Sequence, residues 1–573
     1  MKESNNSLVL RRPVSVGAED SWSPEIHPVL RRIYNARGVI TEAELDYSLS
    51  KILPVSTLTG VDVAAQLILE HQNNRIIIIG DFDADGATST ALVIRCLREF
   101  GIKNVDYLVP NRFEFGYGLT PEIVNVAAES SPALLITVDN GVSSISGVQE
   151  AHKLGMKVLI TDHHLPGQEL PKADAHVNPN LVDSGFGSPN LAGVGVAFYL
   201  MAAVGRILEN GGMTGASKIP ARYLDLVALG TIADVVRLDY NNRILVHQGV
   251  KRIRSGKAIP GIAALLTIGG KSILRTISTD LAFTVGPRLN AAGRLDDMSI
   301  GIECLLTDDS SIAGEISEVL DKINRERKTI EVKMRKEAFD YVDTLEVTDL
   351  PPCLCLYDTN WHQGIVGLIA SRVRERCNRP VIVFARERGG LLKGSARSIP
   401  GVHVRDLLEA VATISPGLIK KFGGHAMAAG LTLIETNYQQ FANIISDCLM
   451  KLYPDADFSG TILTDGSLSS DSMNLSVAKI LREGGPWGAG FPEPLFSGDF
   501  QVVEQRTVGE NHLKMRVRPA GGGDTINAIA FNQAGPVFRG NIQLAYRLDV
   551  NEYRGIESPQ FIVEQIVNID SAP

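Results

Sequence analysis

The sequence lacks the features that mark membrane and secreted proteins. No apolar run among its 573 residues approaches the roughly 18 uninterrupted residues of a membrane-spanning helix, so we expect no membrane span. The start, MKESNNSLVLRRPVSVG, has no apolar core of the signal-peptide type. Only six cysteines occur, and they are scattered, which indicates a reducing compartment and hence the cytoplasm.

The chain also lacks an excess of basic residues. Its 56 Lys and Arg against 65 Asp and Glu leave a net charge of −9. This balance counts mildly against a nucleic-acid partner, because contacts to phosphate drive such binding. The objection is weak if the basic residues are gathered in a channel, since a local positive field steers an anionic substrate whatever the net charge.

Composition is otherwise that of an ordinary globular protein, with 44% hydrophobic and 21% charged residues. The length suggests about three or four domains of ~100–200 residues each. Pattern changes along the chain predict an α/β fold with five parts: an N-terminal extension, partly ordered at best (1–50), a parallel-sheet domain (51–307), a long connector helix (308–345), a smaller α/β domain (346–458) and a β-rich domain (459–573).

The stretch GDFDADGATS at 80–89 is the strongest local signal. Asp81, Asp83 and Asp85 follow directly on an apolar run of four isoleucines. Neighbouring carboxylates repel one another, and burial of an unpaired charge is costly, so the pattern predicts bound cations. The alternative is a solvated acidic turn or a set of helix caps. We expect Asp83 and Asp85 on one face of an extended strand end, followed by a helix that starts after Gly86.

Other apolar segments lead to similar residues. Three of them end in potential ligands: 133–138 at Asp139, 157–161 at Asp162, His163 and His164, and 224–232, interpreted as a further strand, at Asp234. Because the carboxyl ends of parallel strands meet at one edge of a sheet, these side chains should gather there.

Mixed carboxylate and imidazole ligation suits Mn²⁺, and Mg²⁺ is the alternative. The candidate ligands are Asp81, Asp83, Asp85, Asp139, His163 and Asp234. They exceed what one ion takes from protein, so we expect two ions, with the spacing of roughly 3.5–4 Å that suits phosphoryl displacement. Asp139, alone on its strand, is the expected bridge, and Asp81 is either a ligand or a support for the others.

The two histidines need separate roles, because adjacent side chains diverge. A lone histidine is more often structural, but two after an aspartate at a strand end favour a site. We expect His163 to be a ligand and His164 to contact the scissile phosphate, with Asp162 orienting an imidazole. The expected catalytic set is Asp83, Asp85, Asp139, His163, His164 and Asp234.

Several motifs of the chain resemble those of known families. DFDADG, the strand ending in DNG, the DHH triplet and ALGTIADVV resemble the motifs of the DHH phosphoesterase superfamily. GPRLNAAGR (286–294), WHQGIVGLIASR (361–372), KGSARS (393–398) and GGHAMAAG (423–430) resemble, in the same order, the RecJ family of single-strand-specific 5′→3′ DNA exonucleases. The resemblance implies a DHH domain over 51–307, a DHHA1 domain over 346–458 and an OB-fold barrel over 459–573.

The resemblance also implies an activity and a set of DNA contacts. The enzyme would degrade single-stranded DNA to 5′-mononucleotides in repair and recombination, with a single-strand-binding protein and a helicase as partners. Arg294, alone or with Arg288, would hold the 5′ phosphate together with Ser395 and Arg397. The other DNA-binding residues would be Arg112, Tyr117, Asn290 and His425. One chain contains the whole site, so we expect a monomer.

Two segments outside these motifs carry charge in a regular pattern. In the connector, Ile312, Ile316, Val319 and Ile323 recur at helical spacing, and the other face carries Arg325, Arg327, Lys328, Lys333, Arg335 and Lys336. That face is either solvated or walls a nucleic-acid cleft. In 512–518, Lys514, Arg516 and Arg518 alternate with apolar residues and would share one exposed strand face, as in an OB-fold that tracks a single strand.

Two other functions stay open at this point. The chain could be a small-molecule phosphodiesterase acting on dinucleotides, although the β-rich domain and the connector argue against it. It could also be a replication scaffold that has lost its metals, although the set of ligands looks complete.

Overall fold

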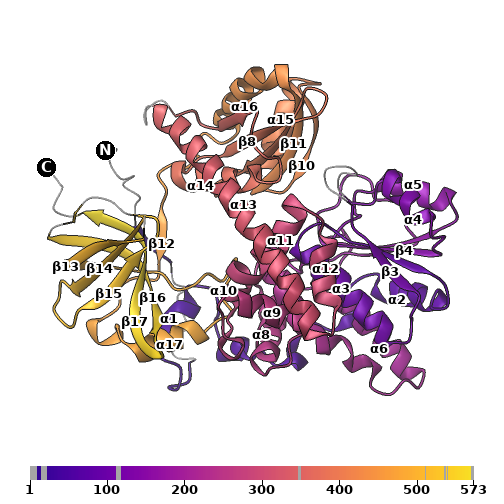
Figure 1. Cartoon of the computed structure of the whole chain (residues 1–573), viewed down its shortest axis with the longest axis horizontal. Coiled ribbons are helices and arrows are strands. Elements are labelled where there is room, and N and C mark those ends of the chain that lie inside the picture. Colours follow the sequence, from indigo (N-terminus) through magenta and orange to yellow (C-terminus); the bar gives the residue numbers. More distant parts are fainter. Residues whose placement is uncertain are drawn as a thin grey trace.

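The structure is a computed structural model that describes residues 9–13, 22–110, 118–345, 350–509, 511–533, 537–538 and 540–568. The predicted DNA contacts Arg112 and Tyr117 lie outside these ranges. Figure 1 shows a parallel-sheet domain at one end, a β-barrel at the other, and a smaller domain above them, with one long helix running between the three.

The first sheet is entirely parallel, as predicted. Its strand order is β3-β2-β4-β5-β6. The strands are β2 (Ile76–Ile79), β3 (Val105–Leu108), β4 (Leu134–Val138), β5 (Lys157–Thr161) and β6 (Ala175–Val177). Helices α2 (Val61–Glu70), α3 (Ala84–Glu99), α4 (Pro121–Ala128), α5 (Ile145–Lys153) and α6 (Gly193–Asn210) surround it.

Helices cover both faces of this sheet. Side chains of a strand alternate between faces, so Ile76 and Ile78 join the core formed with α2, α3 and α6. Ile77 and Ile79 join a second core formed with α4 and α5. All four isoleucines are buried, and each contributes about 1.5–3 kcal/mol by leaving water. The run of isoleucines is therefore a central strand whose end is held rigidly.

The segment 224–232 is a helix, so its interpretation as a strand was wrong. It forms α7 (Leu224–Ala233), with Asp234 as its C-cap. The helix is buried from Leu224 to Ile232 and has apolar residues on every side, with Asp225 as its one charged residue. Such a helix has no periodicity by which to tell it from a buried strand. It belongs to a helical region with α8 (Tyr240–Arg254), α9 (Pro260–Ile268), α10 (Ser278–Asp280), α11 (Gly286–Leu295) and α12 (Ser299–Leu306).

The predicted connector is the helix α13 (Ser310–Thr344). Its buried stripe differs from the expected one, because Ile312 and Val319 remain 47% and 46% exposed. Leu320 joins the core of the first domain, whereas Met334 joins the core of the second. The helix therefore packs against both domains along its length, which the spacing of its isoleucines did not reveal.

Arg327 was expected on the polar face of this helix, and that expectation was wrong. Its side chain is buried, and Nη1 lies 2.7 Å from the Glu331 carboxylate one turn further on. Its Nε donates to Asn324 Oδ1 at 3.1 Å. A buried guanidinium needs such partners, so Arg327 supports the packing of the helix instead of lining a cleft.

The smaller domain contains a mixed sheet of order β10-β11-β9-β8-β7. Its strands are β7 (Leu354–Asp358), β8 (Val381–Glu387), β9 (Leu391–Arg397), β10 (Ile419–Gly424) and β11 (Ala428–Ile434). α14 (Val366–Cys377) shares a core with α13 on one face, and α15 (Val404–Ile414) and α16 (Tyr438–Leu452) cover the other. The predicted smaller α/β domain is confirmed.

The C-terminal domain is a closed barrel of order β13-β14-β15-β17-β16, as the OB-fold expectation requires. Its elements are α17 (Leu475–Glu483), β13 (Phe496–Val508), β14 (His512–Pro519), β15 (Ile526–Ala530), β16 (Asn541–Tyr553) and β17 (Ile556–Asn568). In β14 the apolar residues face the core while Arg516 and Arg518 are exposed. Two tyrosines of β16 precede an arginine: Tyr546 is buried inside the barrel, and Tyr553 is exposed.

Part of the N-terminal extension is built into the fold. β1 (Val9–Arg11) pairs in parallel with β12 (Ile462–Thr464), which leads into the barrel. Tyr34 of α1 (Pro28–Asn35) stacks on Trp487 and Phe491. The Arg37 guanidinium lies 2.8 Å from the buried Asp465 carboxylate. These contacts tie the barrel to the N-terminal segment.

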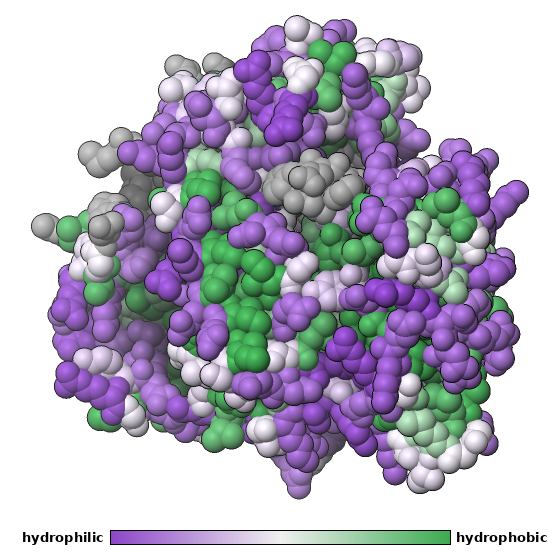
Figure 2. All heavy atoms as spheres, turned by 45° about the vertical axis from the view of Figure 1, so that its right-hand side comes forward, coloured by the Kyte–Doolittle hydropathy of each residue, from purple (hydrophilic) through white to green (hydrophobic). Residues whose placement is uncertain are grey.

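Hydrophilic side chains cover most of the face shown in Figure 2, with an apolar strip near its middle. Within the described ranges no single helix is long and apolar enough to cross a membrane. One pair bent by 77°, Leu49–Thr57 with Val61–Glu70, meets the length and composition criteria only when taken together.

Candidate metal centre and phosphate cavity

The acidic triplet lies at the junction of β2 and α3, not on an extended strand end. Asp83 is the N-cap of α3, and its Oδ1 accepts hydrogen bonds from the backbone N–H groups of Asp85 and Gly86 at 2.9 and 3.0 Å. The helix thus begins at Ala84, before Gly86. A Cβ on Gly86 would lie 2.6 Å from the Asp81 carbonyl oxygen, so only glycine permits this tight turn.

Asp85 is buried and held by a second helix. Its Oδ2 accepts from Gly193 N–H at 2.6 Å and its Oδ1 from Val194 N–H at 3.0 Å, at the first turn of α6. A Cβ on Gly193 would lie 2.6 Å from Asp139 Cβ. Sequence reasoning missed Gly193, because backbone donors 108 residues away leave no local signal. The first of the two glycines in LAGVGVAF was the only local hint.

Asp139 ends β4 in a left-handed conformation, with φ of 61°. Aspartate tolerates this region better than most residues, and Gly141 follows with φ of 115°. The Asn140 side chain donates to the carbonyls of Ile79 at 3.0 Å and Val138 at 2.8 Å. The ends of β2 and β4 are thereby tied together, and this brings Asp139 to the triplet.

Asp162 organises the histidines after β5. Its Oδ1 accepts from the backbone N–H of His163 at 2.8 Å and from the His164 Nδ1 atom at 2.7 Å. Asn178 and Asn180 donate to the carbonyls of His164 and His163 at 2.9 and 2.6 Å. The imidazole that Asp162 orients is thus that of His164. The two asparagines, from VNPN after β6, were also missed.

The seven predicted centre residues converge. The Nε2 atom of His163 lies 3.0 Å from Asp139 Oδ1, 3.5 Å from Asp234 Oδ2 and 4.0 Å from Asp85 Oδ2. Three groups have ligand atoms within 4.8 Å of one another: Asp81, Asp83 and Asp139; Asp85, His163 and Asp234; and Asp139, His163 and His164. Asp139 and His163 each belong to two groups, and of these two only the Asp139 carboxylate has two oxygens to offer to different ions.

Burial and mutual repulsion perturb the acids of this cluster. Burial, and then the charge of Asp83, raise the pKa of Asp85 to about 7. Burial and the neighbouring carboxylates also raise the pKa values of Asp139 and Asp234 well above the ordinary range. Without a bound cation, these three carboxyl groups therefore resist ionisation more than ordinary aspartates do.

The histidines are perturbed in opposite directions. Burial, and then the charge of His164, lower the pKa of His163 to about 3, so its imidazole is neutral at pH 7. Burial also acts to lower the pKa of His164, but the hydrogen bond and charge of Asp162 outweigh it and raise the value to about 9. A neutral imidazole among carboxylates is the protonation state that a metal ligand requires.

The donor set fits divalent cations. Within the described residues it is composed of carboxylates and a neutral imidazole, with no thiolate, and this chemistry suits Mn²⁺ or Mg²⁺ better than Zn²⁺. Cations would remove the repulsion that raises the pKa values of the acids. We therefore conclude that these residues can hold metal.

A cavity of about 350 Å³ adjoins the cluster, and Asp83 and Phe82 form part of its wall. The predicted residues Asn290, Arg294, Ser395 and Arg397 line it too. The Asn290 side chain also accepts a hydrogen bond from Ala84 N–H at 2.8 Å. This bond holds α11 against the start of α3, next to Asp83.

The smaller domain supplies the far wall of this cavity. Ser395 and Arg397 share one face of β9, as predicted, and Arg397 Nη1 donates to Ser395 Oγ at 3.1 Å. The first turn of α14, at Val366 and Gly367, lies on the same wall, and a helix N-terminus attracts anions. Arg294 donates to the Gly364 carbonyl at 3.1 Å across the domain boundary. The cavity is suited to a phosphate group.

The remaining predicted DNA contacts lie elsewhere. The His425 ring lies 5.5 Å from the His164 ring, so the smaller domain also reaches the metal cluster. Arg288 does not line the cavity; its guanidinium pairs with Asp321 at 2.8 Å. Lys514, Arg516 and Arg518 lie on β14 of the barrel, at the opposite end of the molecule from β4 (Figure 1).

Comparison with known proteins agrees with this architecture. Three family models match: the DHH family, N-terminal domain, over residues 75–231; the DHHA1 domain over 350–451; and the RecJ OB domain over 464–565. The chain is 50% identical over 554 residues to the single-stranded-DNA-specific exonuclease RecJ of Escherichia coli K12, covering 95% of this chain and 96% of that one. To its Thermus thermophilus counterpart it is 31% identical over 552 residues, covering 95% and 76%.

Solved structures are similar as well. The crystal structure of RecJ in complex with Mn²⁺ from Thermus thermophilus superposes with a TM-score of 0.76 at 29% identity, covering 95% of this chain and 76% of that one. A structure described as exonuclease RecJ bound to manganese gives a TM-score of 0.58 at 31% identity, covering 71% and 97%. The chain belongs to the RecJ family of single-stranded-DNA-specific exonucleases.

Proposed function

We propose that this chain hydrolyses single-stranded DNA from its 5′ end and releases 5′-mononucleotides, in repair and recombination. One observation carries the proposal: Asp83 belongs to the cluster of candidate metal ligands and also lines the phosphate cavity. A 5′ phosphate held by Arg294, Ser395 and Arg397 would therefore lie at a set distance from the cluster. A fixed distance between the strand end and the site of cleavage yields one nucleotide at a time.

Each residue has a proposed role. Asp81, Asp83, Asp85, Asp139, His163 and Asp234 would hold the metal, and Asp139 would be the carboxylate shared between the ions. Two divalent ions, Mn²⁺ or Mg²⁺, supply electrophilic stabilisation of the attacking and leaving oxygens when bound. Asp162 holds His164 at 2.7 Å, in position to contact the scissile phosphate. Asp85 is positioned by two backbone donors, so its carboxylate keeps one orientation.

The phosphate cavity recognises the strand end through complementary groups. A guanidinium offers several N–H donors in a fixed plane and suits phosphate oxygens. Ser395 adds a hydroxyl, and the first turn of α14 adds backbone N–H groups. We assign Arg294 without Arg288 to the phosphate, since Arg288 is engaged with Asp321. His425 is proposed to contact the strand beside His164.

The experiment uses the full-length chain with Mn²⁺ and single-stranded DNA labelled at one end or the other. A 5′ label should appear at once in mononucleotides, and a 3′ label should stay in long products until late. Blunt duplex DNA serves as the control and should be degraded much more slowly. Early release of the 3′ label contradicts the polarity, and equal rates on duplex contradict the strand specificity.

The proposed partners follow from the substrate. An enzyme that needs exposed single strands depends on a helicase to produce them and meets the single-strand-binding protein that coats them. We also propose that the chain acts as a monomer, because one chain contributes all seven residues of the centre and the whole cavity wall. The proposed place of action is the cytoplasm, because the scattered cysteines suit a reducing compartment.

A further inference from the structure

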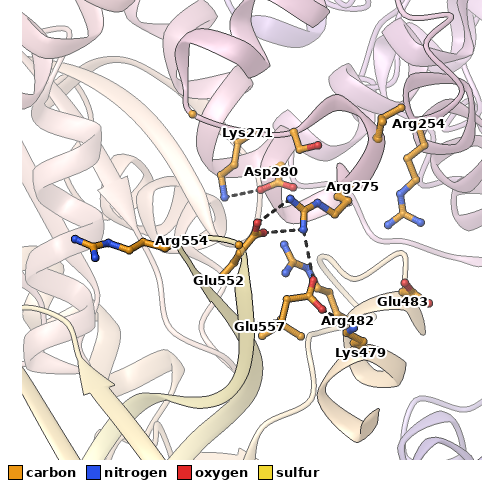
Figure 3. A pocket seen from close by; sticks show the side chains of 15 residues that line it. Arg254, Lys271, Arg275, Asp280, Lys479, Arg482, Glu483, Glu552, Arg554 and Glu557 are labelled. Carbon is orange, nitrogen blue, oxygen red and sulfur yellow. Dashed lines mark hydrogen bonds and ion pairs between the residues drawn. The ribbon is translucent and has the colours of Figure 1, made fainter. Parts of the chain in front are cut away.

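A second cavity, of about 650 Å³, lies where the helical region of the parallel-sheet domain meets the C-terminal domain (Figure 3). Its walls come from the end of α8, the turn after α9, the helix α17 and the β16–β17 hairpin. Both sides of this seam contribute cations: Arg254, Lys271 and Arg275 from the helical region, and Lys479, Arg482 and Arg554 from the C-terminal domain. The carboxylates that line the cavity are those of Asp280, Glu483, Glu552 and Glu557, so cations are in excess.

Half of these cations are neutralised within the cavity. The pairs are Lys271 with Asp280 at 2.7 Å, Arg275 with Glu552 at 2.7 Å, and Lys479 with Glu557 at 2.5 Å. Dashed lines mark them in Figure 3. The pair formed by Arg275 crosses the seam and holds the barrel hairpin against the helical region. The fourth carboxylate, that of Glu483, is exposed.

Arg254 and Arg482 form no ion pair with a carboxylate of the described residues, although they line the same cavity. Arg254, in the last turn of α8, is oriented by its Nε, which donates to the Thr276 carbonyl at 2.6 Å. Arg482 lies in the last turn of α17, on the other side of the seam. Both also line an adjoining recess of about 140 Å³, together with Lys251. Two guanidinium groups from different domains thus converge without a paired anion.

Arg554 has a lesser place in this arrangement. Its side chain is exposed, and Figure 3 shows it directed away from the other cations. Its guanidinium lies 5.2 Å from the centre of the Tyr553 ring, a cation–π contact outside the recess. The unpaired charge inside the cavity is therefore that of Arg254 and Arg482, one from each domain.

The other lining residues indicate which kind of anion fits. None of the described residues that line the cavity is aromatic, and its larger apolar side chains are those of Leu274 and Val550. Unpaired bases of a nucleic-acid strand stack on aromatic rings, which this cavity does not offer. Its volume is in the range of pockets that enclose small ligands. The cavity therefore suits a small anion of high charge that is recognised through its oxygens.

We propose that this cavity binds a free oligophosphate chain, supplied by the triphosphate of a nucleotide or by inorganic polyphosphate. Each guanidinium directs parallel N–H donors at phosphate oxygens. With one phosphate on Arg254 and another on Arg482, the chain ties the C-terminal domain to the helical region and removes the repulsion between the two unpaired cations. The proposal is independent of the proposed function, because neither arginine lines the phosphate cavity beside the metal centre.

The test is calorimetric titration of the full-length chain in EDTA, where no metal-dependent turnover occurs, at about 0.15 M salt. Inorganic triphosphate and ATP should bind with similar affinity, and AMP much more weakly, because AMP has a single phosphate. Arg254→Ala and Arg482→Ala should each lower the affinity for triphosphate about 10-fold, and the double variant about 100-fold. Binding of ATP without binding of inorganic triphosphate overturns recognition through the phosphate chain. An effect of one arginine alone overturns the bridge.

Matched variants isolate the cavity from general charge effects. Arg98→Ala with Arg388→Ala removes the same charge from two exposed positions outside the cavity and should leave triphosphate binding unchanged. Arg397→Ala, in the phosphate cavity, should leave it unchanged as well. Equal losses in these variants and in the double variant overturn the proposal.

Two measurements separate a lost contact from a folding defect. Triphosphate should raise the melting temperature of the unmodified chain and leave that of the double variant unchanged, since a ligand stabilises only the folded state that binds it. Arg482→Lys keeps the charge but loses the planar fork, so its affinity should lie between those of the unmodified chain and Arg482→Ala. An affinity of Arg482→Lys no better than that of Arg482→Ala, or a double variant still stabilised by triphosphate, contradicts the assignment.

Competition tests the two other candidate occupants, a single strand of about 30 nucleotides and a polyglutamate peptide. Neither should lose affinity in the double variant as far as triphosphate does. If either displaces triphosphate from the unmodified chain and shows the same 100-fold loss in the variant, that ligand occupies the cavity and the proposal is wrong. Release of mononucleotides with Mn²⁺ is measured separately, so that a failure of the proposed function is distinguishable from a failure of this site.

Discussion

Gly193 offers a sharp test of the metal centre, because it touches the centre without contributing a side chain. A Cβ at this position would lie 2.6 Å from Asp139 Cβ and 2.8 Å from Asp139 Oδ1. Carbon atoms pack at about 3.5–4.0 Å, so Gly193→Ala must push the two residues apart by about 1 Å. The same backbone N–H holds Asp85 at 2.6 Å, so the shift affects two proposed ligands.

The substitution should reduce activity far more than it reduces folding stability. Overpacking of this kind destabilises by about 1–3 kcal/mol, which leaves most of the protein folded. A displacement of about 1 Å at a reacting centre costs about 100-fold in rate. We therefore expect Gly193→Ala to lower kcat about 100-fold and to weaken Mn²⁺ binding in calorimetry, with only a modest fall in melting temperature.

Gly314→Ala is the matched control, since that glycine lies in the first part of α13 with nothing within 4 Å of the added Cβ. It should keep full activity and gain up to about 1 kcal/mol of stability from helix propensity. Wild-type kcat and Mn²⁺ affinity in Gly193→Ala would refute the close approach of α6 to Asp139 and, with it, this account of the centre.

Three further outcomes are expected. Asp139→Asn should abolish Mn²⁺-dependent turnover and raise the melting temperature in EDTA, because it removes one of several repelling buried carboxylates; a lower melting temperature would contradict the repulsion. Arg397→Ala should lower kcat/KM about 10- to 100-fold on 5′-phosphorylated strands but little on 5′-hydroxyl strands, as steady-state kinetics on both will show. Glu331→Ala should cost about 3–5 kcal/mol by denaturant unfolding, since Arg327 stays buried without its partner, whereas the exposed Glu375→Ala should cost under about 1 kcal/mol.

The parts of the site that the sequence predicted are those with local signals. β-branched runs predict strands, and an acid directly after such a run predicts a ligand at the sheet edge. Asp139 and His163 were found in this way, and they lie 3.0 Å apart. Asp234 was found as well, although for a partly wrong reason, because a buried helix and not a strand delivers it.

The parts that were missed depend on distant contacts. Gly193 donates its own backbone N–H to the distant Asp85 carboxylate, and Asn178 and Asn180 donate to the carbonyls of His164 and His163. No periodicity in the sequence encodes such contacts. Helical spacing in the sequence already argues against Arg288 as a second phosphate ligand beside Arg294. Six residues along an α-helix turn the side chain by about 240°, so the two could not face one cavity.

The geometry of the centre indicates that the fold bears a cost there which bound cations would offset. Asp139 in the centre and Val235 next to Asp234 both have φ of 61°, and for a β-branched valine this conformation is strained by about 1–3 kcal/mol. The acids are buried against their own repulsion, as the raised pKa values of Asp85 and Asp139 show. Neither feature stabilises the chain by itself. Both persist because β2 and β4 are covered by cores on both faces, and both make sense if the carboxylates are positioned for metal rather than for stability.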